Sequence, residues 1–195
     1  MHRTSLITAG LGLAFSLAPA DGQEIYRSAY HDFRAVTVVD GLQNPWSIAF
    51  LPNGEMLVTE KAGTLRVVRD GELLPEPVSG VPEVESRGQG GLLDVVPHPD
   101  FASNRLLYLS YSKPDGNPDS RGTTAVIRGR YEDGRLTGIE EIFEADSDGA
   151  GHYGSRLAFD GNGHLFVTVG DRQVPSTGDL EAHPAQDLSN HHGTV

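Results

Sequence analysis

Short apolar runs separated by turn residues dominate the first half of the chain. The apolar run at 47–51 is followed by the sequence PNG at 52–54, which is typical of a tight turn because Asn and Gly tolerate positive φ. Two further apolar runs, at 56–59 and 65–68, follow after similarly short polar turns. The pattern predicts a meander of three short strands, and no segment of the chain shows a sustained helical period.

A hairpin sequence from this meander occurs again later in the chain. Residues 49–54 and 58–59 match residues 158–163 and 167–168 at a constant offset of 109, and a looser copy lies at 92–109. Strand, turn and strand recurring at irregular spacing predict an all-β fold, with β-propeller blades that carry loop insertions. A β-sandwich, which also alternates short strands with turns, is the alternative.

Two stretches interrupt the strand pattern. Residues 112–122 are polar and rich in Pro and Gly, and we expect them to form an insertion loop between strands at 106–111 and 123–131. Residues 172–192 also have a loop-like composition. Loops of this length in a compact domain are usually functional or disordered.

The first twenty residues have the pattern of a secretory signal peptide. Arg3 gives a positive start, residues 6–17 are mostly apolar, and Ala-Pro-Ala at 18–20 fits a small-x-small cleavage site. An N-terminal membrane anchor is the alternative, but the apolar run is short for a bilayer span. The predicted order is a signal peptide, a lead-in and a partial β-propeller, at 1–20, 21–37 and 38–195. A periplasmic or secreted protein is expected, with no membrane span after cleavage.

Charge and cysteine content exclude several classes of function. The chain has 15 Lys and Arg residues against 27 Asp and Glu, which gives a formal net charge of −12. Nucleic acid is therefore not an expected partner, because phosphate binding needs a basic face. The absence of cysteine from all 195 residues rules out disulfides, Cys-based zinc sites and thiol catalysis.

Two glycine-rich motifs are candidates for the functional site. Gln89 lies in RGQGG at 87–91, where glycines allow close approach of the backbone and the amide offers a donor and an acceptor. His152 lies in GHYGSRL at 151–157, and its small neighbours leave the ring accessible as a general base. The alternatives are a flexible turn at Gln89 and a surface or capping role for His152.

Three polar groups have plainer interpretations. The histidines at 183, 191 and 192 lack the spacing of a helical metal motif, so we interpret this stretch as a loop followed by the start of a strand. Residues 146–149 resemble part of a calcium loop but lack its later ligand positions, which favours a solvated turn. Asp171 and Arg172 are interpreted as an exposed ion pair.

Four strings in order carry a resemblance to a known family: NPWSIAFLPNGEMLVTEKAGTLRVV, GQGGLLDVVPHPDF, GHYGSRLAFDGNGHLFVTVGDR and AQDLSNHHGTV. Together they resemble the N-terminal half of soluble pyrroloquinoline-quinone (PQQ)-dependent aldose sugar dehydrogenases, the glucose/sorbosone dehydrogenase family. The resemblance runs from about Val38 to Val195. It implies a six-bladed β-propeller, of which about the first three blades are present here.

The resemblance also implies roles for single residues. His152 matches the general base, which takes the proton of the aldose C1 hydroxyl while hydride moves to the quinone and the lactone forms. Gln89 matches a residue beside both cofactor and sugar. Glucose-specific members carry Asp before the catalytic His; Gly151 stands there in this chain, which favours the broader aldose branch. PQQ, calcium and an external electron acceptor are the implied cofactors and partner.

Calcium-binding and quinone-carboxylate motifs of the family are expected beyond Val195. We therefore expect this chain to be inactive alone and to represent a gene fragment or partial record. Two other functions stay open: a non-catalytic propeller that binds sugars or proteins, and a hydrolytic propeller such as a lactonase, which needs a carboxylate-rich calcium centre.

Overall fold

A computed structural model describes residues 24–117 and 119–195. The predicted signal peptide at 1–20 lies outside the described residues. The chain divides between Thr37 and Val38 into two units. In the first, β1 (Ile25–Tyr26) pairs antiparallel with β2 (Phe33–Arg34), and the rings of Tyr26 and Phe33 stack 5.5 Å apart.

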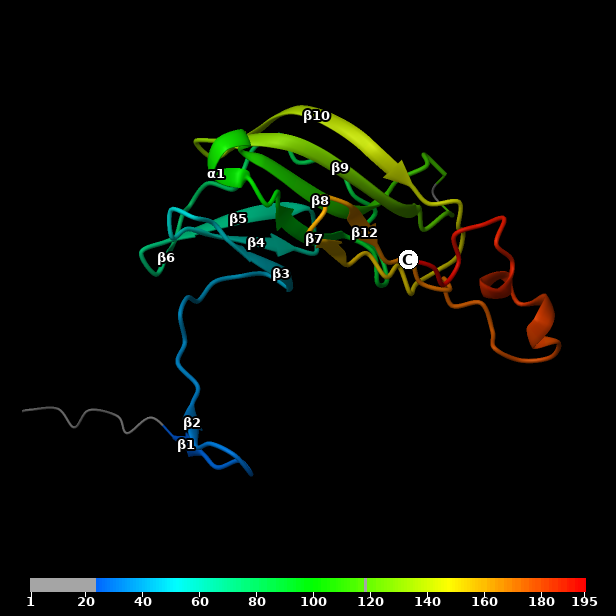
Figure 1. Cartoon of the computed structure of the whole chain (residues 1–195), viewed down its shortest axis with the longest axis horizontal. Helices are drawn as coiled ribbons and strands as arrows, with labels where there is room; N and C mark the ends of the chain where they lie inside the picture. Colours follow the sequence, from blue (N-terminus) through cyan, green and yellow to red (C-terminus); the bar gives the residue numbers. More distant parts are fainter. Residues whose placement is uncertain (1–23, 118) are drawn as a thin grey trace, which may run out of the picture. The chain divides into compact units, whose positions relative to one another are not determined.

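The second unit begins with a four-stranded antiparallel sheet (Figure 1). Its strands are β3 (Pro45–Phe50), β4 (Met56–Glu60), β5 (Thr64–Arg69) and β6 (Glu72–Leu73), in that order. Gly54 forms the first turn at φ +87°, a conformation that glycine adopts without strain. The three-strand meander expected from the apolar pattern is confirmed, and β6 adds a short fourth strand.

A second four-stranded antiparallel sheet follows, in the order β10-β9-β8-β7 (Figure 1). Its strands are β7 (Leu92–Pro97), β8 (Leu106–Lys113), β9 (Thr123–Glu132) and β10 (Arg135–Glu144), with the short helix α1 (Phe101–Asn104) between the first two. The expected loop between β8 and β9 is present. Strand β10 was not expected, because its side chains are mostly exposed and its sequence is polar.

The repeated hairpin opens a third sheet with β11 (Leu157–Phe159) and β12 (Leu165–Val167). These strands occupy the positions that the offset of 109 predicts from β3 and β4. The 3₁₀ turns η1 (Leu180–Ala182) and η2 (Pro184–Gln186) follow within the expected loop region. Among the described residues, no helix is long and apolar enough to cross a bilayer.

Apolar layers join each sheet to the next. One buried cluster lies between the first and second sheets, and includes Leu57, Leu65, Val67, Leu92, Leu107, Leu109 and Ile127. A second joins Tyr108 and Val126 to Leu157 of the hairpin. The middle sheet is therefore covered on both faces, which explains why β8 is buried over six consecutive residues instead of alternating.

A buried carboxylate ties the first strands of the three sheets together. Asp94 on β7 is 3% exposed and accepts a hydrogen bond from Ser47 Oγ on β3 at 2.5 Å. Its other oxygen accepts the backbone N–H of Leu157 on β11 at 2.9 Å. Arg156 Nη1, which lies over the Trp46 ring, approaches Asp94 to 3.2 Å. The Asp94 carboxylate therefore fixes the point at which the loop before β11 ends and the strand begins.

Candidate active site

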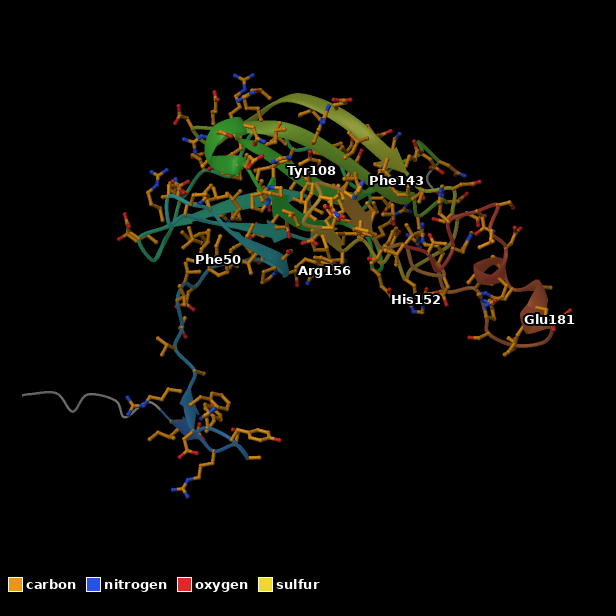
Figure 2. The ribbon with its side chains drawn as sticks, viewed as in Figure 1. Phe50, Tyr108, Phe143, His152, Arg156 and Glu181 are labelled. Carbon is orange, nitrogen blue, oxygen red and sulfur yellow. The ribbon has the colours of Figure 1, made fainter. Side chains whose placement is uncertain are left out.

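His152 lies in the loop before β11, in a backbone conformation that side-chain-bearing residues rarely adopt. Its φ is +43°. Gly170, just after β12, passes so close that a Cβ there would lie 1.8 Å from the His152 carbonyl oxygen. This close backbone contact is available only to glycine, and it fixes the turn. Figure 2 shows His152 and Arg156 along one edge of the unit.

The His152 ring is hydrogen-bonded on one side and open on the other. Its Nδ1 lies 2.6 Å from Asp171 Oδ1, and the side chain is 52% exposed. The hydrogen bond from His152 holds the pKa of Asp171 below its ordinary value, so the carboxylate is ionised and accepts. The proton of a neutral imidazole is thereby placed on Nδ1. Nε2 has no hydrogen-bond partner in the described part of the chain and is left as the basic nitrogen.

Gln89, the second residue expected at the site, contacts the first. Its Oε1 accepts the backbone N–H of His152 at 2.9 Å, although 63 residues separate them in sequence. Arg87 and Glu85 brace the Gln89 loop: Arg87 Nε donates to Glu85 at 2.7 Å. This contact with Arg87 lowers the pKa of Glu85 to about 2.

The expected exposed ion pair between Asp171 and Arg172 is wrong. Asp171 bonds to His152, whereas the side chain of Arg172 is 1% exposed and turns inward. Its guanidinium donates to the carbonyl oxygens of Gly149 at 2.7 Å and Gly151 at 2.9 Å. Arg172 itself has a φ of +58°, a backbone conformation that residues with a side chain rarely adopt.

Gly151 leaves space for two carboxamides beside His152. A Cβ on Gly151 would lie 2.7 Å from the Oε1 and Cδ of Gln173 and 3.0 Å from the Cδ of Gln89. Both amide side chains therefore lie within contact distance of one point above the glycine. An amide supplies both donors and acceptors to sugar hydroxyls.

The C-terminal histidines brace the loop before His152. His191 Nδ1 accepts the backbone N–H of Asp146 at 2.7 Å, and His192 Nε2 lies 3.2 Å from the carbonyl oxygen of Asp148. Thr194 then forms an isolated antiparallel bridge with Val169. These contacts agree with the interpretation of a loop that leads into strand pairing.

The residues present suit acid–base chemistry on a bound hydroxyl group. An exposed imidazole with an oriented basic nitrogen, next to carboxamides, suits proton removal from a bound hydroxyl. The part of the chain that the structure describes holds no group of three or more His, Asp or Glu side chains arranged for a metal ion.

Comparison with known proteins identifies the family of the chain. The model of the Glucose / Sorbosone dehydrogenase family matches residues 42–195. The chain belongs to the glucose/sorbosone dehydrogenase family. It is 44% identical over 148 residues to aldose sugar dehydrogenase YliI of Escherichia coli, covering 73% of this chain and 39% of that enzyme. It is 38% identical over 193 residues to the uncharacterized protein slr1608 of Synechocystis, covering 92% of this chain and 46% of the relative.

Solved structures of this family have the same fold. The apo form of the soluble aldose sugar dehydrogenase of E. coli matches with a TM-score of 0.71 at 42% identity, over 80% of this chain and 44% of the other. The PQQ-bound aldose sugar dehydrogenase of Streptomyces coelicolor matches with a TM-score of 0.67 at 26% identity, over 80% and 45%. The fold is thus part of a β-propeller, with two four-stranded blades and the first hairpin of a third. The chain spans less than half the length of the curated relatives it matches.

The sequence does not reveal that Asp171 is the partner of the His152 ring. Asp171 and Arg172 are adjacent and of opposite charge, and nothing in their local sequence shows that one bonds to His152 while the other is buried. Asp94 left a clearer signal, since a single carboxylate stands inside the apolar run LLDVV. Such a residue must find donors from other elements, and it does.

Proposed function

We propose that the protein oxidises aldose sugars at the C1 hydroxyl to the lactone, as a PQQ-dependent dehydrogenase. The observation that carries this proposal is the exposed His152 ring, held by Asp171 so that Nε2 is the basic nitrogen. Bound PQQ supplies the two-electron acceptor that takes the hydride from C1. An external electron acceptor then completes the cycle.

The chain's own residues do the proton chemistry. His152 Nε2 accepts the proton of the C1 hydroxyl, which leaves an electron-rich oxygen that favours loss of hydride from the same carbon. Asp171 stabilises the imidazolium that forms, because the carboxylate faces the protonated Nδ1. Gln89 holds the His152 backbone through Oε1 and directs its amide nitrogen to cofactor and sugar.

Substrate selectivity follows from Gly151. Without a side chain at this position, no carboxylate stands beside His152 on that side, and carboxamides fill the space instead. We infer an aldose range broader than glucose. Calcium belongs to the same proposal, as does a periplasmic or secreted location based on the signal-peptide pattern at 1–20.

Replacement of the base gives the test. The protein is reconstituted with PQQ and calcium, and aldose-dependent dye reduction is measured. His152→Ala is expected to keep PQQ binding and to lose about 10²- to 10⁴-fold in kcat, the usual contribution of a general base. His164→Ala is the matched control, because His164 pairs with Asp160 at 2.8 Å in the exposed β11–β12 turn.

The outcomes separate the alternatives. Parental turnover in the His152→Ala protein removes the base assignment. A parental protein that binds sugars without oxidising any aldose supports the binding propeller. Lactone hydrolysis that needs calcium but not PQQ supports the hydrolytic propeller.

A further inference from the structure

Arg172 is a buried cation with no carboxylate bound to it among the described residues. Its side chain is 1% exposed, and burial lowers its pKa. The donors of the guanidinium are directed to backbone carbonyl oxygens: those of Gly149, Gly151, Gly122 and Ser147. One face of the guanidinium lies 4.1 Å from the centre of the Tyr153 ring.

These contacts grip the chain on both sides of His152. Arg172 Nε donates to the carbonyl oxygen of Gly151, the residue before the base, at 2.9 Å. The ring under the guanidinium belongs to Tyr153, the residue after it. The base itself is not touched by Arg172. Its ring is held by the neighbouring Asp171 instead.

The same guanidinium ties this turn to the rest of the unit. Arg172 Nη2 reaches Gly122, just before β9, at 3.0 Å. Gly149 permits the approach, since a Cβ there would lie 2.4 Å from the Arg172 carbonyl oxygen. Arg172 therefore fixes the position of the strained turn at His152, with φ +43°, relative to the middle sheet as well as to the hairpin that follows the turn.

Burial of a charge is costly, and a buried ion is weak evidence for stability. An apolar side chain of similar volume packs a core at lower cost. A guanidinium differs from such a side chain because its five donors, in a rigid planar arrangement, can fix several carbonyl groups at once.

We propose that Arg172 is a positioning residue that sets the place of His152 by holding Gly151 and Tyr153 on either side of it. Only the expected change in rate depends on the proposed function. A displacement of about 1 Å in a catalytic group is enough to cost roughly 10²-fold in rate. Arg172 therefore affects the chemical step more than the affinity for sugar.

Two substitutions separate positioning from simple packing. Arg172→Met keeps an unbranched apolar stem but removes every donor. Arg172→Lys keeps the charge but cannot reach four separated carbonyls. Arg128→Lys is the matched control, because Arg128 bonds to Glu140 at 2.8 Å on the exposed face of β9 and β10. Each variant is compared with the parental protein for PQQ binding, kcat and KM per PQQ-loaded site, and the NMR resonances of the His152 ring.

Arg172→Met and Arg172→Lys are expected to lower kcat by about 10- to 100-fold with little change in KM, and to shift the His152 ring resonances while those of His164 stay in place. Added guanidinium ion is expected to restore part of the rate to Arg172→Met. Parental kcat per loaded site with unmoved His152 resonances overturns the proposal, even where the melting temperature falls.

The ring resonances also keep the two proposals apart. A parental protein that oxidises no aldose defeats the proposed function, and the NMR comparison then decides the role of Arg172 without any activity. Should Arg172→Met not fold, Arg172→Lys carries the same measurements.

Discussion

Asp171 Oδ1 lies 2.6 Å from His152 Nδ1, where the segment after β12 runs beside the loop before β11. The same oxygen accepts a hydrogen bond from the backbone N–H of Gln173 at 3.1 Å. This second contact holds the carboxylate in position independently of the His152 ring. This relationship determines which imidazole nitrogen is basic. The contact is expected to affect the reaction rate, because it leaves Nε2 as the nitrogen that accepts a proton.

Asp171→Asn is expected to lower kcat by about 10²- to 10⁴-fold, since an amide neither stabilises the imidazolium nor enforces the Nδ1 tautomer. KM is expected to change little. Asp160→Asn is the control, because Asp160 holds His164 by a similar contact at 2.8 Å away from the site. Steady-state dye reduction by the two variants is the measurement, and equal kcat values speak against a role for Asp171.

The proposed function gives the two ends of the Gln89 amide separate roles. Oε1 accepts the His152 N–H at 2.9 Å, whereas the amide nitrogen is assigned to substrate. Gln89→Ala is expected to raise KM, as loss of uniform binding does, and to lower kcat by releasing the His152 backbone. Gln89→Glu keeps an acceptor, so kcat is expected to recover while KM stays high. Equal kcat for both variants refutes the backbone contact as a kinetic factor.

Gly170 tests how tightly the backbone beneath His152 is packed. A methyl group on Gly170 would lie 1.8 Å from the His152 carbonyl oxygen, so Gly170→Ala must move the turn that carries the base. We expect kcat to fall by about 10²-fold, with a lower melting temperature. Gly161→Ala is the control, since a Cβ there meets nothing within 4 Å. Activity near parental in Gly170→Ala shows that the turn adapts.

The sequence predicts the strands better than the site. Apolar runs and turn residues mark β3, β4 and β5, and the offset of 109 identifies the hairpin of β11 and β12, because these signals are local. Strand β10 escapes detection since its exposed, polar face lies at the edge of its sheet. Contacts such as Arg172 with Gly122 join residues 50 apart, and no local pattern encodes them.

Glu85 gives the loop of Gln89 a defined dependence on pH. The hydrogen bond with Arg87 lowers the pKa of Glu85 from 4.5 to about 2. The stabilisation is therefore complete above pH 4.5 and lost as pH falls towards 2. Glu85→Gln is expected to flatten the stability curve in this window, as measured by urea unfolding at several pH values. An unchanged slope contradicts the role of the pair.

Asp94 gives the sharpest test of how the three sheets are joined. Its carboxylate accepts hydrogen bonds from Ser47 Oγ on β3 and from the backbone N–H of Leu157 on β11. Asp94 is 3% exposed. Asp94→Asn keeps the shape but turns an NH₂ group towards a donor. Unsatisfied buried groups of this kind, together with the loss of a buried charge for Arg156, cost roughly 3–5 kcal/mol of unfolding free energy.

Ser47→Ala is the graded comparison, because it removes one donor and leaves the carboxylate its other partners. We expect a loss of about 1.5–3 kcal/mol, the range for a hydrogen bond to a charged group. Chemical denaturation of both variants measures the difference. If Asp94→Asn costs no more than Ser47→Ala, the carboxylate is not the shared anchor of the sheets, and the apolar layers alone hold the first strands in register.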